Sequence, residues 1–185
     1  MSDFVTLHEV GPRDGLQNEP NLIATADKVR LINLLGTSGL RHIEVGSFVS
    51  PKWVPQMADT AQVLAQIAPT TAQTAVLVPN MKGWDGFIAA RQPSTDYQVA
   101  VFISASEGFS QSNLGCSIAD SVDCLAPVIK AAQSAGVALR GYVSFVTDCP
   151  FDGPTAPAAV AHALAMLTGL APIPLSLIHI PPSPP

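Results

Sequence analysis

Short runs rich in β-branched residues alternate with longer helical stretches along most of the chain, and this alternation limits the folds it can adopt. Strands are expected at residues 4–10, 41–47, 74–80, 97–104 and 137–144. Helices are expected at residues 25–38, 54–67, 81–90, 117–135 and 157–167. Strands that alternate with helices pair in parallel through right-handed crossovers. The sequence therefore predicts an α/β fold with five βα units.

Residues at the ends of the expected helices support these boundaries. Thr25 precedes an apolar helical run and is expected to be its N-cap, and Ser117 is expected to cap the helix that contains Asp120. Gly39 and Gly136 follow helices at the position where a left-handed conformation is common. These signals support the boundaries of the helices at 25–38 and 117–135.

A doubly wound sheet and a (β/α)₈ barrel both satisfy the alternation, and the polar residues favour the barrel. The first strand is not followed by GxGxxG, as a dinucleotide-binding fold would require. Polar residues instead follow several strands, namely Arg13, Asp14, Ser47, Asn80, Ser104, Ser106 and Ser144. Barrel enzymes build their sites from such strand ends, and a whole barrel needs roughly 250 residues. We therefore expect an incomplete TIM barrel.

The last residues break the βα pattern. After residue 170 the sequence reads APIPLSLIHIPPSPP, and six of these residues are proline. Proline lacks the N–H donor that an interior strand needs. We therefore expect residues 1–170 to form the N-terminal part of the barrel and residues 171–185 to be an irregular or out-of-frame tail. A proline-rich recognition tail is the alternative.

Composition and charge exclude several classes of partner. The net charge is -5, and the nine basic residues are scattered singly, so neither nucleic acid nor a membrane surface is an expected partner. The N-terminus resembles no leader, and the three cysteines have no metal-type spacing. Reduced thiols fit a cytosol. We expect a cytoplasmic protein.

The stretch EVGPRDGLQNE places Arg13 beside Asp14 directly after the first expected strand. A carboxylate at a strand end is a suitable ligand for a hard divalent cation. A fixed guanidinium can stabilise an oxygen that gains negative charge during a reaction. Together they suggest enolate chemistry on a carbonyl substrate. The alternative is an Asp that caps a turn beside a solvated Arg.

Glu44 lies between Ile43 and Val45 in the next expected strand. Strict alternation turns His42, Glu44 and Gly46 toward one face, the barrel interior. A carboxylate there needs a partner, and Arg13 is the nearest candidate. Glu44 would then orient the guanidinium rather than react. His8 and His42 could be metal ligands, although single histidines near the start of a strand are more often core residues.

Four segments resemble the 3-hydroxy-3-methylglutaryl-CoA lyase family. They are EVGPRDGLQNE, IEVGSFVSPKWVPQMAD, LVPNMKG and KAAQSAGVALRGYVS, and the resemblance extends from about Val5 to Leu167. The Arg-Asp-Gly-x-Gln motif is also shared with isopropylmalate, homocitrate and citramalate synthases. The SFVSPKWVPQMAD segment is the specific one. The resemblance implies a TIM barrel with a pyruvate carboxyltransferase-like domain.

The resemblance also implies an activity: metal-assisted cleavage of hydroxymethylglutaryl-CoA, an acyl-CoA substrate, to acetyl-CoA and acetoacetate, as in leucine degradation and ketone body metabolism. Asp14 is similar to the family's ligand for Mg²⁺ or Mn²⁺. Arg13 is similar to the arginine that stabilises the enolate, and Glu44 to a residue that shapes the catalytic site. The implied substrate-binding residues, beside Arg13, are Gln17, Ser47, Arg140 and Tyr142.

Other features of the family are missing from the sequence. The family takes two histidine ligands from an HxH motif, an asparagine ligand from a later strand and a catalytic cysteine from a glycine-rich loop. None of these segments occurs here. We therefore expect an inactive, C-terminally truncated fragment of a protein whose full-length form is a homo-oligomer. The alternatives are an acyl-CoA-condensing synthase of the same superfamily and a non-catalytic half-barrel.

Overall fold

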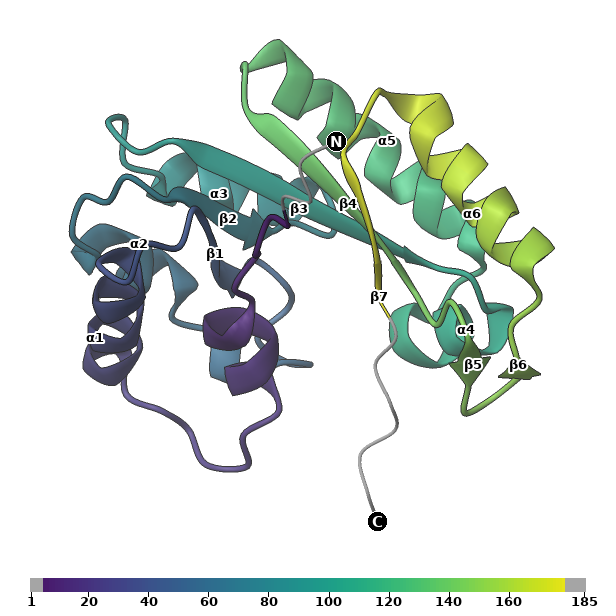
Figure 1. Cartoon of the computed structure of the whole chain (residues 1–185), viewed down its shortest axis with the longest axis horizontal. Helices are drawn as coiled ribbons and strands as arrows, with labels where there is room; N and C mark the ends of the chain where they lie inside the picture. Colours follow the sequence, from purple (N-terminus) through teal and green to yellow (C-terminus); the bar gives the residue numbers. More distant parts are fainter. Residues whose placement is uncertain (1–4, 179–185) are drawn as a thin grey trace. The chain divides into compact units, whose positions relative to one another are not determined.

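The structure is a computed structural model and describes residues 5–178. The chain divides into two compact units (Figure 1). The first unit comprises residues 1–78 and 82–99, and the second comprises residues 79–81 and 100–185. Strand β3 (Tyr97–Ser104) begins in the first unit and ends in the second.

The first unit carries a parallel sheet in the order β1-β2-β3. Its elements, besides the start of β3, are η1 (Gly11–Gly15), α1 (Thr25–Gly36), β1 (His42–Ser47), η2 (Pro55–Met57), α2 (Thr60–Gln66), β2 (Gln73–Leu77) and α3 (Met81–Ala90). Phe87 is fully buried and lies at the centre of an aromatic cluster, with ring centroids 5.7 Å from Trp84 and 5.4 Å from Tyr97. This cluster packs α3 onto the sheet.

The second unit carries strands in the order β3-β4-β7. Its further elements are α4 (Glu107–Leu114), α5 (Ile118–Ser134), β4 (Ala138–Ser144), β5 (Asp148–Cys149), β6 (Gly153–Pro154), α6 (Pro157–Leu170) and β7 (Leu175–Ile178). Strands β5 and β6 form a two-residue antiparallel hairpin. Helices α5 and α6 lie side by side along β4 (Figure 1).

The predicted helices are present, with two differences at their ends. Ser117 and Asp120 form a complete capping box at the start of α5, as predicted. Gly39 and Gly136 have positive φ values of 90° and 65°. Thr25, by contrast, is the first residue of α1 rather than its N-cap. The expected helix at residues 54–67 is divided into η2 and α2.

The first expected strand is wrong for the part that the structure describes. Residues 5–10 contain a single parallel bridge, between Glu9 and Ile43, and no continuous strand. The chain turns into η1 directly afterwards because Pro12 fixes a helical φ there. Valine and threonine in this run predicted a strand, but pairing reaches only Glu9.

Strict alternation in β1 is also wrong. A register shift lies between Glu44 and Gly46, so Val45 is an additional residue. A Cβ atom on Gly46 would lie 2.7 Å from Cγ2 of Thr60, at the start of α2. The bulge shifts the alternation by one residue and brings Ser47, rather than Gly46, into phase with Glu44.

The chain after residue 170 differs from the expected irregular tail. Residues Leu175–Ile178 form β7, which pairs in parallel with β4. Gly141 permits this close approach, because a Cβ atom there would lie 2.6 Å from Cδ2 of Leu175. Prolines 172 and 174 precede the strand and therefore leave its hydrogen bonds intact. The remaining tail, residues 179–185, lies outside the described residues, and the boundary at residue 170 stays a prediction.

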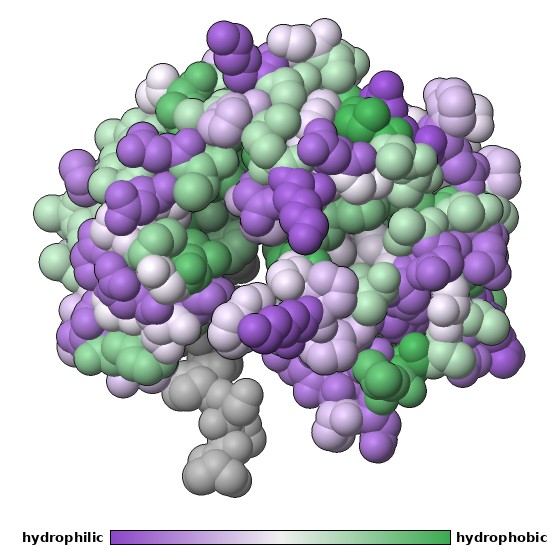
Figure 2. Space-filling model, turned by 180° about the vertical axis from the view of Figure 1, so that it is seen from behind, coloured by the Kyte–Doolittle hydropathy of each residue, from purple (hydrophilic) through white to green (hydrophobic). Residues whose placement is uncertain are grey.

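Hydrophobic and hydrophilic side chains are mixed on the surface. On the face drawn in Figure 2, hydrophobic residues occur in small groups among hydrophilic ones. Trp53 and Phe151 are the most exposed aromatic side chains among the described residues, with 80% and 56% of their surface accessible. Within residues 5–178, no helix is long and apolar enough to cross a membrane.

Candidate active site

Arg13 is the centre of a charged cluster in the first unit. Its Nε donates to Oε1 of Glu44, and its Nη1 donates to Oδ1 of Asp14 at 2.6 Å. Arg13 is 7% exposed and Glu44 only 2%. The ion pair expected between them is thus present. A buried carboxylate with a charged partner fixes the plane of the guanidinium, because the pair would be costly to separate.

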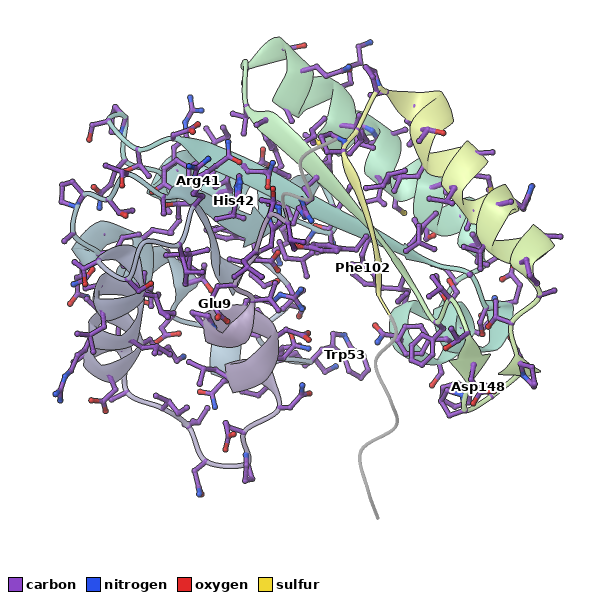
Figure 3. The ribbon with its side chains drawn as sticks, viewed as in Figure 1. Glu9, Arg41, His42, Trp53, Phe102 and Asp148 are labelled. Atoms are coloured by element: carbon purple, nitrogen blue, oxygen red, sulfur yellow. The ribbon has the colours of Figure 1, made fainter. Side chains whose placement is uncertain are left out.

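The backbone before Arg13 is anchored to β1. The amide of Glu9 donates to the carbonyl of His42 at 3.0 Å, and the amide of Glu44 donates to the carbonyl of Glu9 at 2.8 Å. The Glu9 side chain adds a local contact, since its Oε1 accepts from the amide of Gly11 at 2.6 Å. Figure 3 labels Glu9 beside the turn of η1. These contacts place Arg13 opposite Glu44.

Sequence reasoning missed the contact between the Glu9 carboxylate and the amide of Gly11. Its carboxylate occupies the position that a Cβ atom on Gly11 would need, at 2.7 Å. A side chain at position 11 would therefore displace the Glu9 carboxylate from the Gly11 amide. The Glu-x-Gly spacing at the end of an apolar run was the available signal.

Two groups in the cluster keep capacity for a ligand. Among the described residues, Nη2 of Arg13 and Oδ2 of Asp14 have no hydrogen-bond partner. Neither atom is among the described side-chain atoms that are fully buried and lack a hydrogen-bond partner. The Asp14 side chain is 29% exposed. The cluster can thus present one positive N–H group and one carboxylate oxygen to the same ligand.

Asp14 is the residue of this cluster that could bind a divalent cation. Its Oδ2 is a suitable hard donor, while Oδ1 is occupied by Arg13. Within residues 5–178, no group of three or more His, Cys, Asp or Glu side chains could hold a metal ion. The rings of His8 and His42 stack on each other with centroids 4.1 Å apart. They are not part of the Asp14 cluster.

Ser47 and Gln17 belong to the same unit but have different surroundings. Ser47 is 1% exposed, and its hydroxyl donates weakly to the carbonyl of Leu77 at 3.4 Å. Its backbone is fixed by Thr60, whose hydroxyl donates to the Ser47 carbonyl at 2.9 Å. Gln17 follows η1 and is partly exposed. The substrate-binding roles of Ser47 and Gln17 stay predictions.

Arg140 and Tyr142 lie two residues apart on β4, in the second unit. The guanidinium carbon of Arg140 is 5.5 Å from the centroid of the Tyr142 ring. The pair therefore shares one face of β4, opposite to that of Gly141, which approaches Leu167 of α6. Their substrate-binding role also stays a prediction.

A second polar cluster joins the β5-β6 hairpin to α4. Oδ2 of Asp152 accepts from the Ser106 hydroxyl at 2.6 Å and from the amide of Gly108 at 2.8 Å. The hydrogen bond from Ser106, and then that from Gly108, lowers the pKa of Asp152. The Ser106 oxygen also lies 2.9 Å from Sγ of Cys149, a buried free thiol. Sequence analysis gave Asp152 no role, because its partners are more than 40 residues away in the chain.

Phe145 has an unusual backbone. Its φ is 57°, the single positive value among the described residues other than glycine. The side chain is 5% exposed and packs against Phe109 of α4, with ring centroids 4.1 Å apart and the rings tilted by 42°. The left-handed conformation costs about 1–2 kcal/mol for such a residue. Packing against Phe109 offsets that cost.

The parallel α/β sheet and its likeness to solved barrels define a class: the chain carries part of a TIM barrel. More particularly, it belongs to the HMGL-like family, which matches residues 5–176. The chain is 53% identical to 3-hydroxy-3-isohexenylglutaryl-CoA/hydroxy-methylglutaryl-CoA lyase of Pseudomonas aeruginosa over 158 residues, 85% of this chain and 51% of that protein.

Two solved structures have the same fold. The hydroxymethylglutaryl-CoA lyase from Pseudomonas aeruginosa is 48% identical, with a TM-score of 0.87 over 94% of this chain and 57% of that chain. The HMG-CoA lyase from Acinetobacter baumannii, in complex with coenzyme A and 3-methylmalate, is 30% identical, with the same TM-score over 96% and 58%. The chain spans about half the length of the curated relatives that it matches.

Proposed function

We propose that the chain is part of a hydroxymethylglutaryl-CoA lyase, which cleaves 3-hydroxy-3-methylglutaryl-CoA to acetyl-CoA and acetoacetate. One observation carries the proposal: Arg13 is buried and fixed by Glu44, yet its Nη2 keeps an unused N–H group next to the Asp14 carboxylate. A guanidinium held in this way can act on a developing negative charge without having to reorganise.

The reaction explains why such an arginine is needed. As the C3 hydroxyl loses its proton and becomes the ketone of acetoacetate, the bond between C2 and C3 breaks and leaves its electron pair on the acetyl-CoA fragment. This pair delocalises onto the thioester oxygen as an enolate, which then takes up a proton at C2 to give acetyl-CoA. In the proposed role, Arg13 donates from Nη2 to that oxygen. Glu44 does not react. It holds Nε, so that the guanidinium plane faces the substrate.

Asp14 is the proposed ligand for Mg²⁺ or Mn²⁺. Oδ2 would bind the cation, and Oδ1 would remain with Arg13. A bound divalent cation supplies positive charge that polarises the substrate's hydroxyl and carboxylate oxygens. With one oxygen donor in the cluster, we expect weak cation binding and no measurable acetoacetate release from residues 1–185 alone.

The substrate class is an acyl-CoA thioester. The Acinetobacter relative in complex with coenzyme A supports this choice. We assign substrate contacts to Gln17, Ser47, Arg140 and Tyr142. The three free thiols are consistent with a reducing compartment, so we propose the cytoplasm and a role in leucine degradation and ketone body metabolism. A homo-oligomeric full-length form stays a prediction.

A chimera tests the function. Residues 1–170 are fused to the C-terminal half of the Pseudomonas aeruginosa relative, and acetoacetate release is measured at steady state with Mn²⁺. Arg13→Met should lower kcat by roughly 10²-fold or more, the scale for losing one oxyanion donor. The control is Arg41→Met, because Arg41 is exposed at the start of β1. A change in KM alone would show that Arg13 binds the ground state and transition state equally, contrary to the proposal.

A further inference from the structure

Gln56, in η2, is a buried amide whose two ends are both engaged. It is 3% exposed. Its Oε1 accepts from the amide of Ile23 at 2.9 Å. Its Nε2 donates to the carbonyl of Asn21 at 2.9 Å and, more weakly, to that of Glu19 at 3.4 Å. One side chain thus forms hydrogen bonds with the backbone of residues 19–23 in both directions.

Residues 19–23 need such a partner because they belong to no helix or strand. A backbone group that loses water without gaining a partner is costly. This segment directly follows the turn that carries Arg13 and Asp14. The chain before the turn is anchored by Glu9 to β1. Gln56 supplies the second anchor, after the turn.

Gln56 is itself held by a partly buried ion pair between Lys28 and Asp59. Nζ of Lys28, on α1, donates to the Gln56 carbonyl and to Oδ1 of Asp59, the latter at 2.7 Å. Oδ2 of Asp59 accepts from the Thr25 hydroxyl at 2.8 Å. Lys28 is 5% exposed. These contacts fix η2 against α1, so the amide of Gln56 cannot follow residues 19–23 if they move.

We propose that Gln56 is a positioning residue for the active site, acting on Arg13 and Asp14 through residues 19–23. It fixes the end of the turn and thereby the orientation of the Arg13 guanidinium against Glu44. The chemistry that this orientation serves rests on the function proposed above. The positioning of Arg13 and Asp14 by Gln56 is inferred only from contacts within the first unit.

The proposal gives a role to a second residue of the segment that begins with Ser47. Gln56 lies in the SFVSPKWVPQMAD segment. Within that segment Trp53 is 80% exposed and Gln56 is buried, so the conspicuous aromatic residue does not make these contacts.

An isosteric variant separates hydrogen bonding from packing. Gln56→Glu preserves the side-chain volume and the acceptor for Ile23. It removes the donor and places a carboxylate oxygen against the Asn21 carbonyl. Because the segment loses its hydrogen bond at the Asn21 carbonyl, it should open more often, and we expect the Ile23 amide, although it keeps its acceptor, to exchange with solvent about five- to tenfold faster, the scale of losing one hydrogen bond. The Nε–H signal of Arg13 in the NMR spectrum should shift. A residue that only stabilised the fold would leave that signal in place.

The control is Gln66→Glu, which adds the same charge on the exposed face of α2, where Gln66 donates to the Gln62 carbonyl. It should leave both signals unchanged. An unchanged Arg13 Nε–H signal in folded Gln56→Glu would overturn the proposal. If that variant does not fold, the wild-type chain still decides: a protected Ile23 amide supports the proposal, and an Ile23 amide that exchanges at the unprotected rate overturns it.

The same spectra test this inference and the proposed function separately. Line broadening by added Mn²⁺ should centre on Asp14 if the cation site is correct. Broadening elsewhere would contradict the cation site, whereas the Gln56 inference is decided by the Arg13 and Ile23 signals measured without Mn²⁺.

Discussion

The turn of η1 and the β5-β6 hairpin are two short segments that are held in place by different forces. In the first unit, η1 is held by a buried pair of full charges, Arg13 and Glu44. In the second unit, the hairpin is held by an exposed carboxylate, Asp152, and by aromatic packing around Phe109. Breaking a buried ion pair costs several kcal/mol of stability, so its geometry is fixed. Replacing an exposed charged residue costs much less. The difference is the one expected if η1 carries the proposed reactive groups and the hairpin does not.

The largest effect should come from breaking the buried pair. Glu44→Ala leaves the Arg13 guanidinium without its buried partner, so the free energy of unfolding should fall by about 3–5 kcal/mol. Urea unfolding measures it. Glu19→Ala, an exposed residue in the same unit, should change stability by less than about 0.5 kcal/mol. Equal losses for both variants would contradict the claim that a buried charge pair holds η1 in place.

In the hairpin unit, a smaller loss is expected from steric overlap. A Cβ atom on Gly108 would lie 2.3 Å from Oδ1 of Asp152 and 2.8 Å from Cβ of Phe151. Gly108→Ala should therefore cost about 1–3 kcal/mol in thermal or urea unfolding. Gly169→Ala in α6 is the matched control, because nothing lies within 4 Å of its Cβ position. That change should stabilise the helix by about 0.5–1 kcal/mol, since alanine is the better helix former.

The left-handed backbone of Phe145 predicts which of two variants, Gly or Ala, is the more stable at this position. Replacing Phe145 by Ala or by Gly removes the same packing against Phe109, but only Gly accepts φ of 57° freely. Phe145→Gly should thus be more stable than Phe145→Ala by about 1 kcal/mol. The reverse order is expected for Phe87 in α3, where glycine has a lower helix propensity. The same order at both sites would show that Phe145 carries no backbone strain.

The smallest effect is a pH dependence at Asp152. Its pKa is lowered in the folded state by the Ser106 and Gly108 hydrogen bonds, from an ordinary value of 3.8. The stabilisation is therefore complete above the unfolded-state pKa and is lost as pH falls through the folded-state value. The difference in stability between the wild type and Asp152→Asn should shrink between about pH 6 and about pH 3. Asp85→Asn, at an exposed residue of α3, is the control. A difference that is constant with pH would contradict the shift.

The sequence predicted the contact between Arg13 and Glu44 better than the segments around it. Arg13, Asp14 and Glu44 could be identified because each follows or lies in a patterned strand, and their charges need partners. The bulge at Val45 could not, since it depends on the register with β2. Strand β7 was missed because prolines dominate its local pattern, while its pairing with β4 is a tertiary effect. Gln56 was missed because its partners are more than 30 residues away.

Binding of Mn²⁺ to the 185-residue chain tests the central claim that Arg13, Asp14 and Glu44 form the cation and enolate site. In amide NMR spectra, added Mn²⁺ should broaden the signals of η1 around Asp14 first. Asp14→Asn should abolish this broadening, and Asp27→Asn, at an exposed residue of α1, should leave it intact. Broadening that centres on another segment, or that survives Asp14→Asn, would contradict the claim.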